Sequence, residues 1–181
     1  MILEMIKFRL KDGREGVLKT PRAFDAKDLL AYIIQSCGET EFLSRYPEEW
    51  NLTIAQEEAW IRRLREDPDA MMIACYVDGR VAGNCEIRFR REMKTAHRAT
   101  VAIALLRDYW GQGIGTRMLT ELIEVAQNRG VKIVELEVLE GNRRAMSLYE
   151  KLGFRKLCEK PNAFKLKDGS YRSEIQMQKY L

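Results

Sequence analysis

The feature that most constrains the fold is a strand, a glycine-rich loop and a helix that follow one another without a break. Residues 99–106 (ATVAIALL) are apolar at nearly every position, which predicts a central strand covered on both faces. The chain then runs through Tyr109–Thr116 (YWGQGIGT) into residues 115–127, whose apolar side chains recur at helical spacing. The segment therefore predicts a sheet with a helix packed against it.

The glycine loop predicts an anion-binding site. Gly111, Gly113 and Gly115 remove side chains from the start of the helix, where the first N–H groups have no intrahelical partner. A helix N-terminus also carries about half a positive charge, and the Thr116 hydroxyl is a further donor. A Walker A loop would need a Gly-Lys pair and a dinucleotide fingerprint the spacing GxGxxG, and the loop has neither. A tight turn that binds nothing is the alternative.

A second motif lies on a later helix, predicted over residues 143–151. Asn142 and Tyr149 are separated by about two helical turns, so they share a face with the small residue Ala145 between them. Two polar residues that flank a small one predict a groove. The alternatives are that Asn142 only caps the helix and that Tyr149 is a core aromatic.

The remaining pattern predicts a mixed sheet with helices on both faces, in a single domain spanning residues 1–181. The local signals are turn dipeptides, a capping box at Thr53 and Gln56, and apolar periodicity. The predicted elements are a hairpin of 2–10 and 14–20, a helix over 24–36 behind a possible cap at Asp25, a helix from Thr53 to Pro68, a hairpin of 71–77 and 80–89 on Asp78-Gly79, a strand over 131–139, and two closing strands around 167–169. We expect the first hairpin to be architectural.

Composition excludes several classes of protein. Four scattered cysteines and the single His97 argue against structural zinc and a disulfide framework, so we expect no metal. A net charge of +4, from 31 basic and 27 acidic residues, is too small and dispersed for a nucleic-acid stripe and fits a small polyanionic ligand. Charges at Glu4, Lys7 and Arg9 interrupt the first apolar residues, so we expect a cytoplasmic protein with no membrane segment.

The two motifs together resemble the GNAT superfamily of N-acetyltransferases. The family's later stretch, Asn-x-x-Ala-x-x-Leu-Tyr-x-x-x-Gly-Phe, stands here as Asn142, Ala145, Leu148, Tyr149, Gly153 and Phe154. The match is close over about residues 70–160. The resemblance implies the GNAT fold, a central mixed and largely antiparallel sheet with helices on both faces, in which a splayed pair of parallel strands forms the cofactor cleft.

The resemblance also implies that acetyl-CoA is the acyl donor. Backbone groups of Ile103, Ala104 and Leu105 would pair with the amides of the pantetheine arm, which Asn142 and Tyr149 would also contact. The pyrophosphate would be held by the loop N–H groups, namely those of Gly111, Gln112, Gly113, Ile114, Gly115 and Thr116. The family usually has Gln or Arg where this chain has Trp110, so one side-chain contact to phosphate is expected to be lost.

Two residues are the catalytic candidates. Tyr149 matches the family's acid, a phenol that protonates the leaving thiolate. Glu137 is the preferred base, because the run Leu136-Glu137-Val138 resembles that of ribosomal-protein alanine N-acetyltransferases, where the matching glutamate acts on the amine through water. The alternative makes Glu137 a solvent-facing strand residue, and Glu86, His97 and bulk water are its rivals.

Most candidates for the amine-acceptor site lie between the first two predicted helices. The family places its acceptor site beside the helices that follow the first strand, where Gly38–Trp50 is rich in glutamates and aromatics. Glu41, Tyr46 and Glu48, with Glu86, could enclose a cationic amine of a small molecule or peptide. A solvated acidic loop is the alternative, and homodimer formation stays open.

Two other classes of function are set against the enzyme. A non-catalytic acetyl-CoA sensor would keep the glycine loop and Asn142 but would need no Tyr149. A nucleic-acid-binding protein would have to use the basic residues between Arg88 and Arg98, the only candidate patch. The presence of Tyr149 favours the enzyme, and we expect no nucleic-acid partner.

Overall fold

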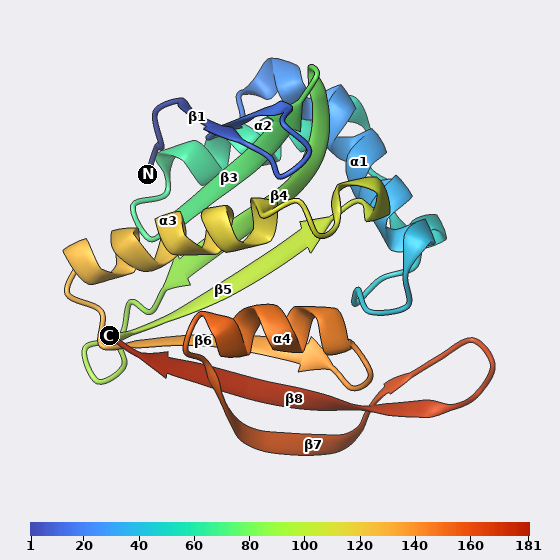
Figure 1. Cartoon of the computed structure of the whole chain (residues 1–181), viewed down its shortest axis with the longest axis vertical. Coiled ribbons are helices and arrows are strands. Elements are labelled where there is room, and N and C mark those ends of the chain that lie inside the picture. Colours follow the sequence, from blue (N-terminus) through green and yellow to red (C-terminus); the bar gives the residue numbers. More distant parts are fainter.

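The computed structural model describes all residues from 1 to 181, and it contains one sheet of eight strands (Figure 1). The strand order is β1-β2-β3-β4-β5-β6-β8-β7, and every neighbouring pair is antiparallel except β5 and β6. The strands are β1 Ile6–Arg9, β2 Glu15–Lys19, β3 Ala70–Val77, β4 Arg80–Phe89, β5 Arg98–Leu105, β6 Ile133–Leu139, β7 Arg155–Lys165 and β8 Tyr171–Tyr180. The α-helices are α1 Ala26–Glu39, α2 Ile54–Glu66, α3 Ile114–Asn128 and α4 Arg143–Lys151, and the 3-10 helices are η1 Ala23–Asp25, η2 Pro47–Glu49 and η3 Arg107–Tyr109.

Helices cover both faces of the sheet, as predicted. The Sγ of Cys85 on β4 lies 3.9 Å from the carbonyl of Met118 on α3, while the neighbouring Asn84 meets the hydroxyl of Tyr32 on α1 at 3.0 Å. Successive strand residues point to opposite faces, so α1 and α3 lie on opposite sides. Figure 1 shows α3 and α4 together in front of the sheet.

Local signals determine most element boundaries. The Asp78-Gly79 turn between β3 and β4 has φ angles of 49° and 76°, the left-handed geometry of a tight hairpin. The capping box of α2 is complete, because Thr53 Oγ1 accepts from the N–H of Gln56 at 3.3 Å and Gln56 Oε1 accepts from that of Thr53 at 2.8 Å. Asp25 does precede α1, but its carboxylate accepts from Arg22 and Lys19 and makes no cap bond.

The prediction that the central strand is covered on both faces was wrong. Ala99 and Val101 of β5 are buried beneath α3, whereas Ala102 on the other face is exposed and Thr100 is only half-buried. The helices α1 and α2 pack against β4 and β3, and α1 reaches β5 near its end, where the hydroxyl of Tyr32 donates to the carbonyl of Ala104 at 2.8 Å. Small, weakly polar side chains tolerate either environment, so the apolar pattern did not reveal the bare face.

The parallel strands β5 and β6 separate along their length. They pair only from Arg98 with Ile133 to Thr100 with Glu135, although β5 continues to Leu105 and β6 to Leu139. The N–H of Leu106 donates to the carbonyl of Ala82 on β4 at 3.0 Å. Backbone groups of neighbouring strand residues point in opposite directions, so those of Leu105 face the opening. The predicted splayed pair is confirmed.

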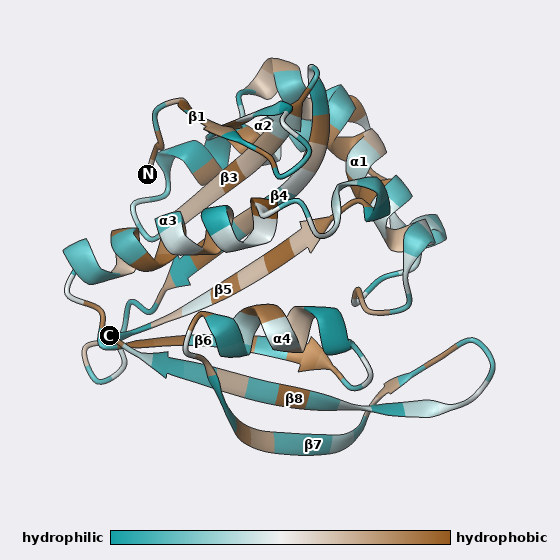
Figure 2. Ribbon diagram, in the orientation of Figure 1, coloured by the Kyte–Doolittle hydropathy of each residue, from teal (hydrophilic) through white to brown (hydrophobic).

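The buried apolar residues form one continuous cluster between the sheet and its helices. Figure 2 shows this pattern in the brown stretches of β3 and β5, against the long teal stretches of β7 and β8. Cys37, Cys75 and Cys85 are buried and Cys158 is exposed, and all four are free thiols. None of the helices combines the length and the apolar character needed to cross a membrane.

Candidate active site

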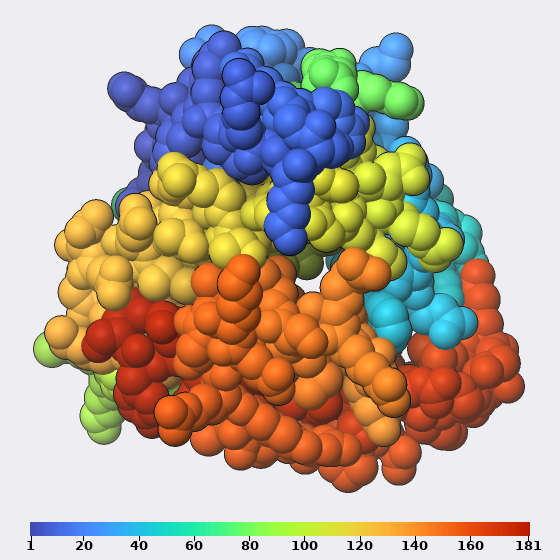
Figure 3. Space-filling view, in the orientation of Figure 1, coloured from blue at the N-terminus to red at the C-terminus, as the bar shows by residue number.

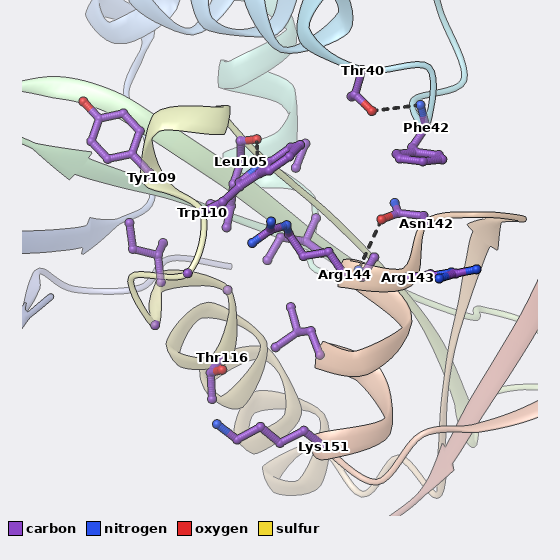
Figure 4. A pocket seen from close by; sticks show the side chains of 18 of the residues that line it. Thr40, Phe42, Leu105, Tyr109, Trp110, Thr116, Asn142, Arg143, Arg144 and Lys151 are labelled. Atoms are coloured by element: carbon purple, nitrogen blue, oxygen red, sulfur yellow. Dashed lines mark hydrogen bonds between the residues drawn. The ribbon is translucent and has the colours of Figure 1, made fainter. Parts of the chain in front are cut away.

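A cleft of about 430 Å³ opens where β5 and β6 separate. Its walls are the end of β5, the glycine loop, the start of α4 and the segment after α1 that includes Thr40 and Phe42. Figure 3 shows a hollow between the yellow α3 region and the orange α4, and Figure 4 shows the side chains that line it. Residues far apart in the sequence therefore meet around one cavity.

The glycine loop presents a row of free N–H groups to this cleft. Gly111 and Gly113 have φ angles of 77° and 89°, which only glycine adopts without strain. The first helical hydrogen bond of α3 runs from the N–H of Arg117 to the carbonyl of Gly113. The N–H groups from Gly111 to Thr116 donate to no backbone or side-chain acceptor, so a helix N-terminus with unpartnered donors faces the cavity.

Gly115 serves a different purpose from the other two glycines. A Cβ at this position would lie 2.9 Å from Cδ2 of Leu148 on α4 and 3.4 Å from Cδ1 of Leu105 on β5. Its φ angle is not in the left-handed region. Gly115 therefore lets α3 approach α4 and β5 closely, at residues that all line the cleft.

The cleft is lined by cations and by no carboxylate. Arg143, Arg144 and Lys151 come from α4, and Lys11 comes from the loop between β1 and β2. Sequence reasoning missed all four, although Arg144 and Lys151 stand about two helical turns apart and so share a face. A cleft of this charge attracts an anion.

The first hairpin, which we expect to be architectural, also contributes Lys11 to the lining of the cleft. The N–H of Lys11 donates to the carbonyl of Gln112 at 3.3 Å, and that of Asp12 donates to Gln112 Oε1 at 3.1 Å. The side chain of Gln112 therefore binds the hairpin and does not line the cavity. This contact holds the glycine loop against β1 and β2.

Asn142 is both a helix cap and a cleft residue. Its Oδ1 accepts from the N–H of Ala145 at 3.2 Å, the N-cap bond of α4. The same side chain lines the cavity together with Ala145 and Leu148. Its amide nitrogen has no partner, so it keeps a donor for a ligand.

Tyr149 lies beside the cavity and is not part of its lining. The side chain is 6% exposed, and its ring packs edge-on against Phe154 with centroids 6.1 Å apart. Burial raises the pKa of Tyr149 to about 12, because the phenolate form would lose its solvation. The phenol is therefore protonated at neutral pH.

Most of the predicted cofactor residues meet around the cavity. Gln112 and Tyr149 are the two that do not line it. Those that do are Ile103, Ala104, Leu105, Gly111, Gly113, Ile114, Gly115, Thr116 and Asn142.

The predicted base Glu137 lies on the bare face of the sheet, past the point where β6 leaves β5. Its carboxylate is about half exposed and lies 3.4 Å from Nζ of Lys160, which pairs more closely with Glu174. Glu86 shares this face and pairs with Arg88 at 3.2 Å. His97 precedes the paired end of β5, at the closed end of the splay, which places this rival away from the cleft.

The predicted acceptor residues do not form a set of free carboxylates. The hydroxyl of Tyr46 accepts from the N–H of Lys167 at 2.9 Å, and Glu48 pairs with the side chain of the same lysine. Lys167 Nζ also lies 4.2 Å from the centre of the Tyr46 ring. Glu41 is exposed. Tyr46 and Glu48 thus connect the segment after α1 to the β7–β8 turn.

Comparison with known proteins identifies the family. Residues 36–154, which contain both motifs and all of the cleft lining except Lys11, match the model of the Acetyltransferase (GNAT) family. The chain belongs to the GNAT family. The GNAT match includes the strand β5, the glycine loop and all of α4.

Curated relatives of this GNAT chain are N-acetyltransferases. Ribosomal protein bS18-alanine N-acetyltransferase of Escherichia coli strain K12 is 40% identical over 67 residues, which are 37% of this chain and 45% of that protein. Thialysine N-epsilon-acetyltransferase of Mus musculus is 42% identical over 57 residues, 32% of this chain and 34% of that protein. The chain thus matches less than half the length of these relatives.

Solved structures share the whole fold. An acetyltransferase of the GNAT family from Streptococcus pneumoniae superposes with a TM-score of 0.85 at 24% identity, over 92% of this chain and 99% of that one. An acetyltransferase from Salmonella typhimurium, described with its cofactor acetyl-CoA, has a TM-score of 0.77 at 16% identity, over 92% and 94% of the two chains. At these identities the likeness establishes the GNAT fold.

Proposed function

We propose that residues 1–181 form a single N-acetyltransferase domain that moves the acetyl group of acetyl-CoA to a primary amine of a small molecule or peptide. The amine attacks directly, with no acyl-enzyme. The observation that carries the proposal is the row of free N–H groups from Gly111 to Thr116 at the start of α3, inside a cleft lined by cations.

The residues of the cleft fit coenzyme A. Unpartnered amides at a helix N-terminus suit a pyrophosphate, and Lys11, Arg144 and Lys151 supply positive charge around it. On the side away from β4, the backbone of β5 from Ile103 to Leu105 has no partner strand and can pair with an amide-bearing arm, as an added peptide strand would. The free amide nitrogen of Asn142 is a further donor to that arm.

When bound, acetyl-CoA supplies an activated acetyl thioester, and the chain supplies position and protons. Tyr149 holds a proton at its Oη throughout the neutral range, as a donor to a leaving thiolate must. Glu137 lies on the uncovered sheet face, in the part of β6 that has separated from β5. Its carboxylate is exposed to water, so it can take a proton from the amine through a water molecule. These roles place acid and base on opposite sides of β6.

The proposed acceptor is an amine. The names of two relatives specify acetylation of an alanine and of thialysine, both at nitrogen. The sheet face that includes the bare face of β5 carries carboxylates, but Glu86 of β4 pairs with Arg88 and Glu135 of β6 pairs with Arg98. Charge alone therefore does not favour a polycation, and a single amine of a small molecule or peptide fits better.

The test is release of free thiol from acetyl-CoA in the presence of polyamines, aminoglycosides, amino acids and N-terminal peptides. We expect turnover with at least one class of amine. Tight cofactor binding without turnover on any acceptor would contradict the proposed enzyme and favour a binding protein.

A matched pair of glycine variants tests the cradle itself. Gly113 and Gly130 both have positive φ angles and open space where a Cβ would stand, but only Gly113 lies at the cleft. We expect Gly113→Ala to weaken coenzyme A binding at least tenfold more than Gly130→Ala, since each costs about 1 kcal/mol of backbone strain but only the first disturbs the amides. Equal effects would remove the loop from the binding site.

A further inference from the structure

The indole of Trp110 hydrogen-bonds to a backbone carbonyl on the open edge of β5. Its Nε1–H donates to the carbonyl of Leu105 at 2.8 Å, and both residues line the cleft. Figure 4 shows the ring lying against Leu105 inside the cavity. Because β6 has already separated from β5 at this point, no strand competes with the indole for that carbonyl.

Two arginines hold the indole in this position. The guanidinium of Arg144 reaches from α4 across the cleft and lies 4.8 Å from the centre of the ring. The guanidinium of Arg107 lies 5.8 Å from it and also donates to the carbonyl of Glu39. Contacts of this kind favour a fixed ring orientation. Arg144 from α4 and Arg107 from η3 therefore both support the hydrogen bond between the indole and Leu105.

A cofactor arm that pairs with β5 needs the same carbonyl. Strand addition exchanges N–H and C=O groups along the open edge, so an amide N–H of the arm would donate where the indole N–H now donates. The two donors are chemically equivalent and compete for one site. A side chain at position 110 without an N–H in this place would leave the carbonyl free.

We propose that Trp110 is a specificity-determining residue that competes with the amide-bearing arm of the acyl donor for the carbonyl of Leu105. The inference rests on the proposed function, because it takes the cleft to be the coenzyme A site. A ligand displaces the indole only by offering its own amide N–H at Leu105. The competition thereby lowers the affinity for a ligand that carries an amide-containing arm and leaves the affinity for a ligand without one unchanged.

The test measures binding of two probes by calorimetry. Coenzyme A carries the arm, whereas adenosine 3′,5′-bisphosphate has nucleotide phosphates and no arm. Trp110→Phe keeps a ring for Arg144 but has no N–H. We expect this variant to bind coenzyme A about threefold to tenfold more tightly than the unmodified protein, as loss of one competing hydrogen bond predicts, and to bind the bisphosphate equally. Trp110→Leu, which lacks the ring as well, should change in the same direction.

Indole fluorescence gives a second readout that does not depend on turnover. Coenzyme A should shift the tryptophan emission of the unmodified protein, because the indole leaves its hydrogen bond, and the shift should be absent in Trp110→Phe. Trp60→Phe is the matched control, since Trp60 lies on α2 and does not line the cleft. This control should keep the shift.

Two results would overturn the proposal. One leaves the proposed function standing, and the other overturns it as well. Equal or weaker coenzyme A binding by Trp110→Phe, while the unmodified protein binds normally, would mean that the indole stays in place or contacts the arm. Failure of the unmodified protein to bind either probe would overturn the proposed function together with this inference.

Discussion

At the scale of single residues, burial determines how Tyr149 can act. Its hydroxyl has no hydrogen-bond partner in the protein, and its pKa of about 12 keeps it protonated across the range in which enzymes are assayed. In the proposed role of general acid, this phenol would contribute to turnover and make little difference to cofactor affinity. The contributions of the hydroxyl and of the ring can be separated experimentally, because phenylalanine lacks the hydroxyl but retains the packing against Phe154.

We expect Tyr149→Phe to lower turnover about 100-fold, a usual contribution of a general acid, while the Kd for acetyl-CoA changes less than about twofold. Steady-state kinetics and calorimetry measure the two quantities. Tyr180→Phe, at an exposed position on β8, is the control and should leave both unchanged. Equal turnover of Tyr149→Phe and the unmodified protein would remove Tyr149 from the mechanism.

The burial of Glu57 on α2 leads us to expect that the free energy of unfolding depends on pH. Its side chain is buried, its Oε1 has no partner, and burial raises its pKa. The folded state therefore holds the proton more tightly than the unfolded state, so stability falls as pH rises above the ordinary glutamate pKa. Glu57→Gln should raise the free energy of unfolding by about 1 kcal/mol at pH 7.

The pH profile distinguishes this effect from a general change in packing. The gain from Glu57→Gln should vanish at acidic pH, where the carboxyl is protonated in both states. Urea unfolding at several pH values measures it. Glu58→Gln, which affects an exposed pair with Arg62, should show no such gain, and a pH-independent difference for Glu57→Gln would contradict the account.

At the scale of elements, the contact between β4 and β5 sets the position of the cleft edge. A Cβ on Gly83 would lie 2.7 Å from the carbonyl of Ala104 and 2.1 Å from Cδ2 of Leu105. Since the carbonyl belongs to the backbone, β5 would have to move as a strand. Gly83→Ala should therefore cost about 1–3 kcal/mol of stability and also weaken coenzyme A binding.

Gly38 on α1 is a control for which we expect the opposite change in stability. A Cβ on Gly38 would meet only Cγ of Pro47 at an ordinary 3.5 Å, and its φ angle is helical. Gly38→Ala should stabilise the protein by about 0.5–1 kcal/mol, because alanine loses less backbone entropy in a helix. Thermal unfolding checks both signs, and stabilisation by Gly83→Ala would show that β5 does not lie as close as described.

The elements also show which features the sequence could predict. The Asp78-Gly79 turn and the Thr53 capping box depend on neighbouring residues, so their signals are local and both are present in the structure. The bare face of β5 depends on how far α1 and α2 extend, and an alanine at position 102 does not indicate whether that face is covered. Lys11 and Trp110 reach the cleft from loops, whose paths follow no periodicity.

At the scale of the whole molecule, one lysine connects the β7–β8 turn to the segment that follows α1. Lys167, in the β7–β8 turn, contacts both Tyr46 and Glu48 in the segment after α1. The ion pair is largely exposed, so it contributes little to global stability. Its effect should be local, on the segment that borders the cavity at Phe42.

We expect Lys167→Ala to change the free energy of unfolding by less than about 1 kcal/mol while amide exchange in residues 40–50 becomes several-fold faster. The KM for the acceptor should rise with kcat little changed, because the loosened segment positions the amine less well. Lys165→Ala, on the same hairpin, is the control. Unchanged exchange in residues 40–50 would mean that other contacts hold the segment.

The central claim is that the N–H groups from Gly111 to Thr116 hold the pyrophosphate of coenzyme A. An amide NMR titration of the labelled protein with coenzyme A tests it most directly, because it reports on these groups one by one. We predict that the largest shifts fall on Gly111 to Thr116 and on Ile103 to Leu105. Saturable binding that leaves the amides of Gly111 to Thr116 unshifted would contradict the account.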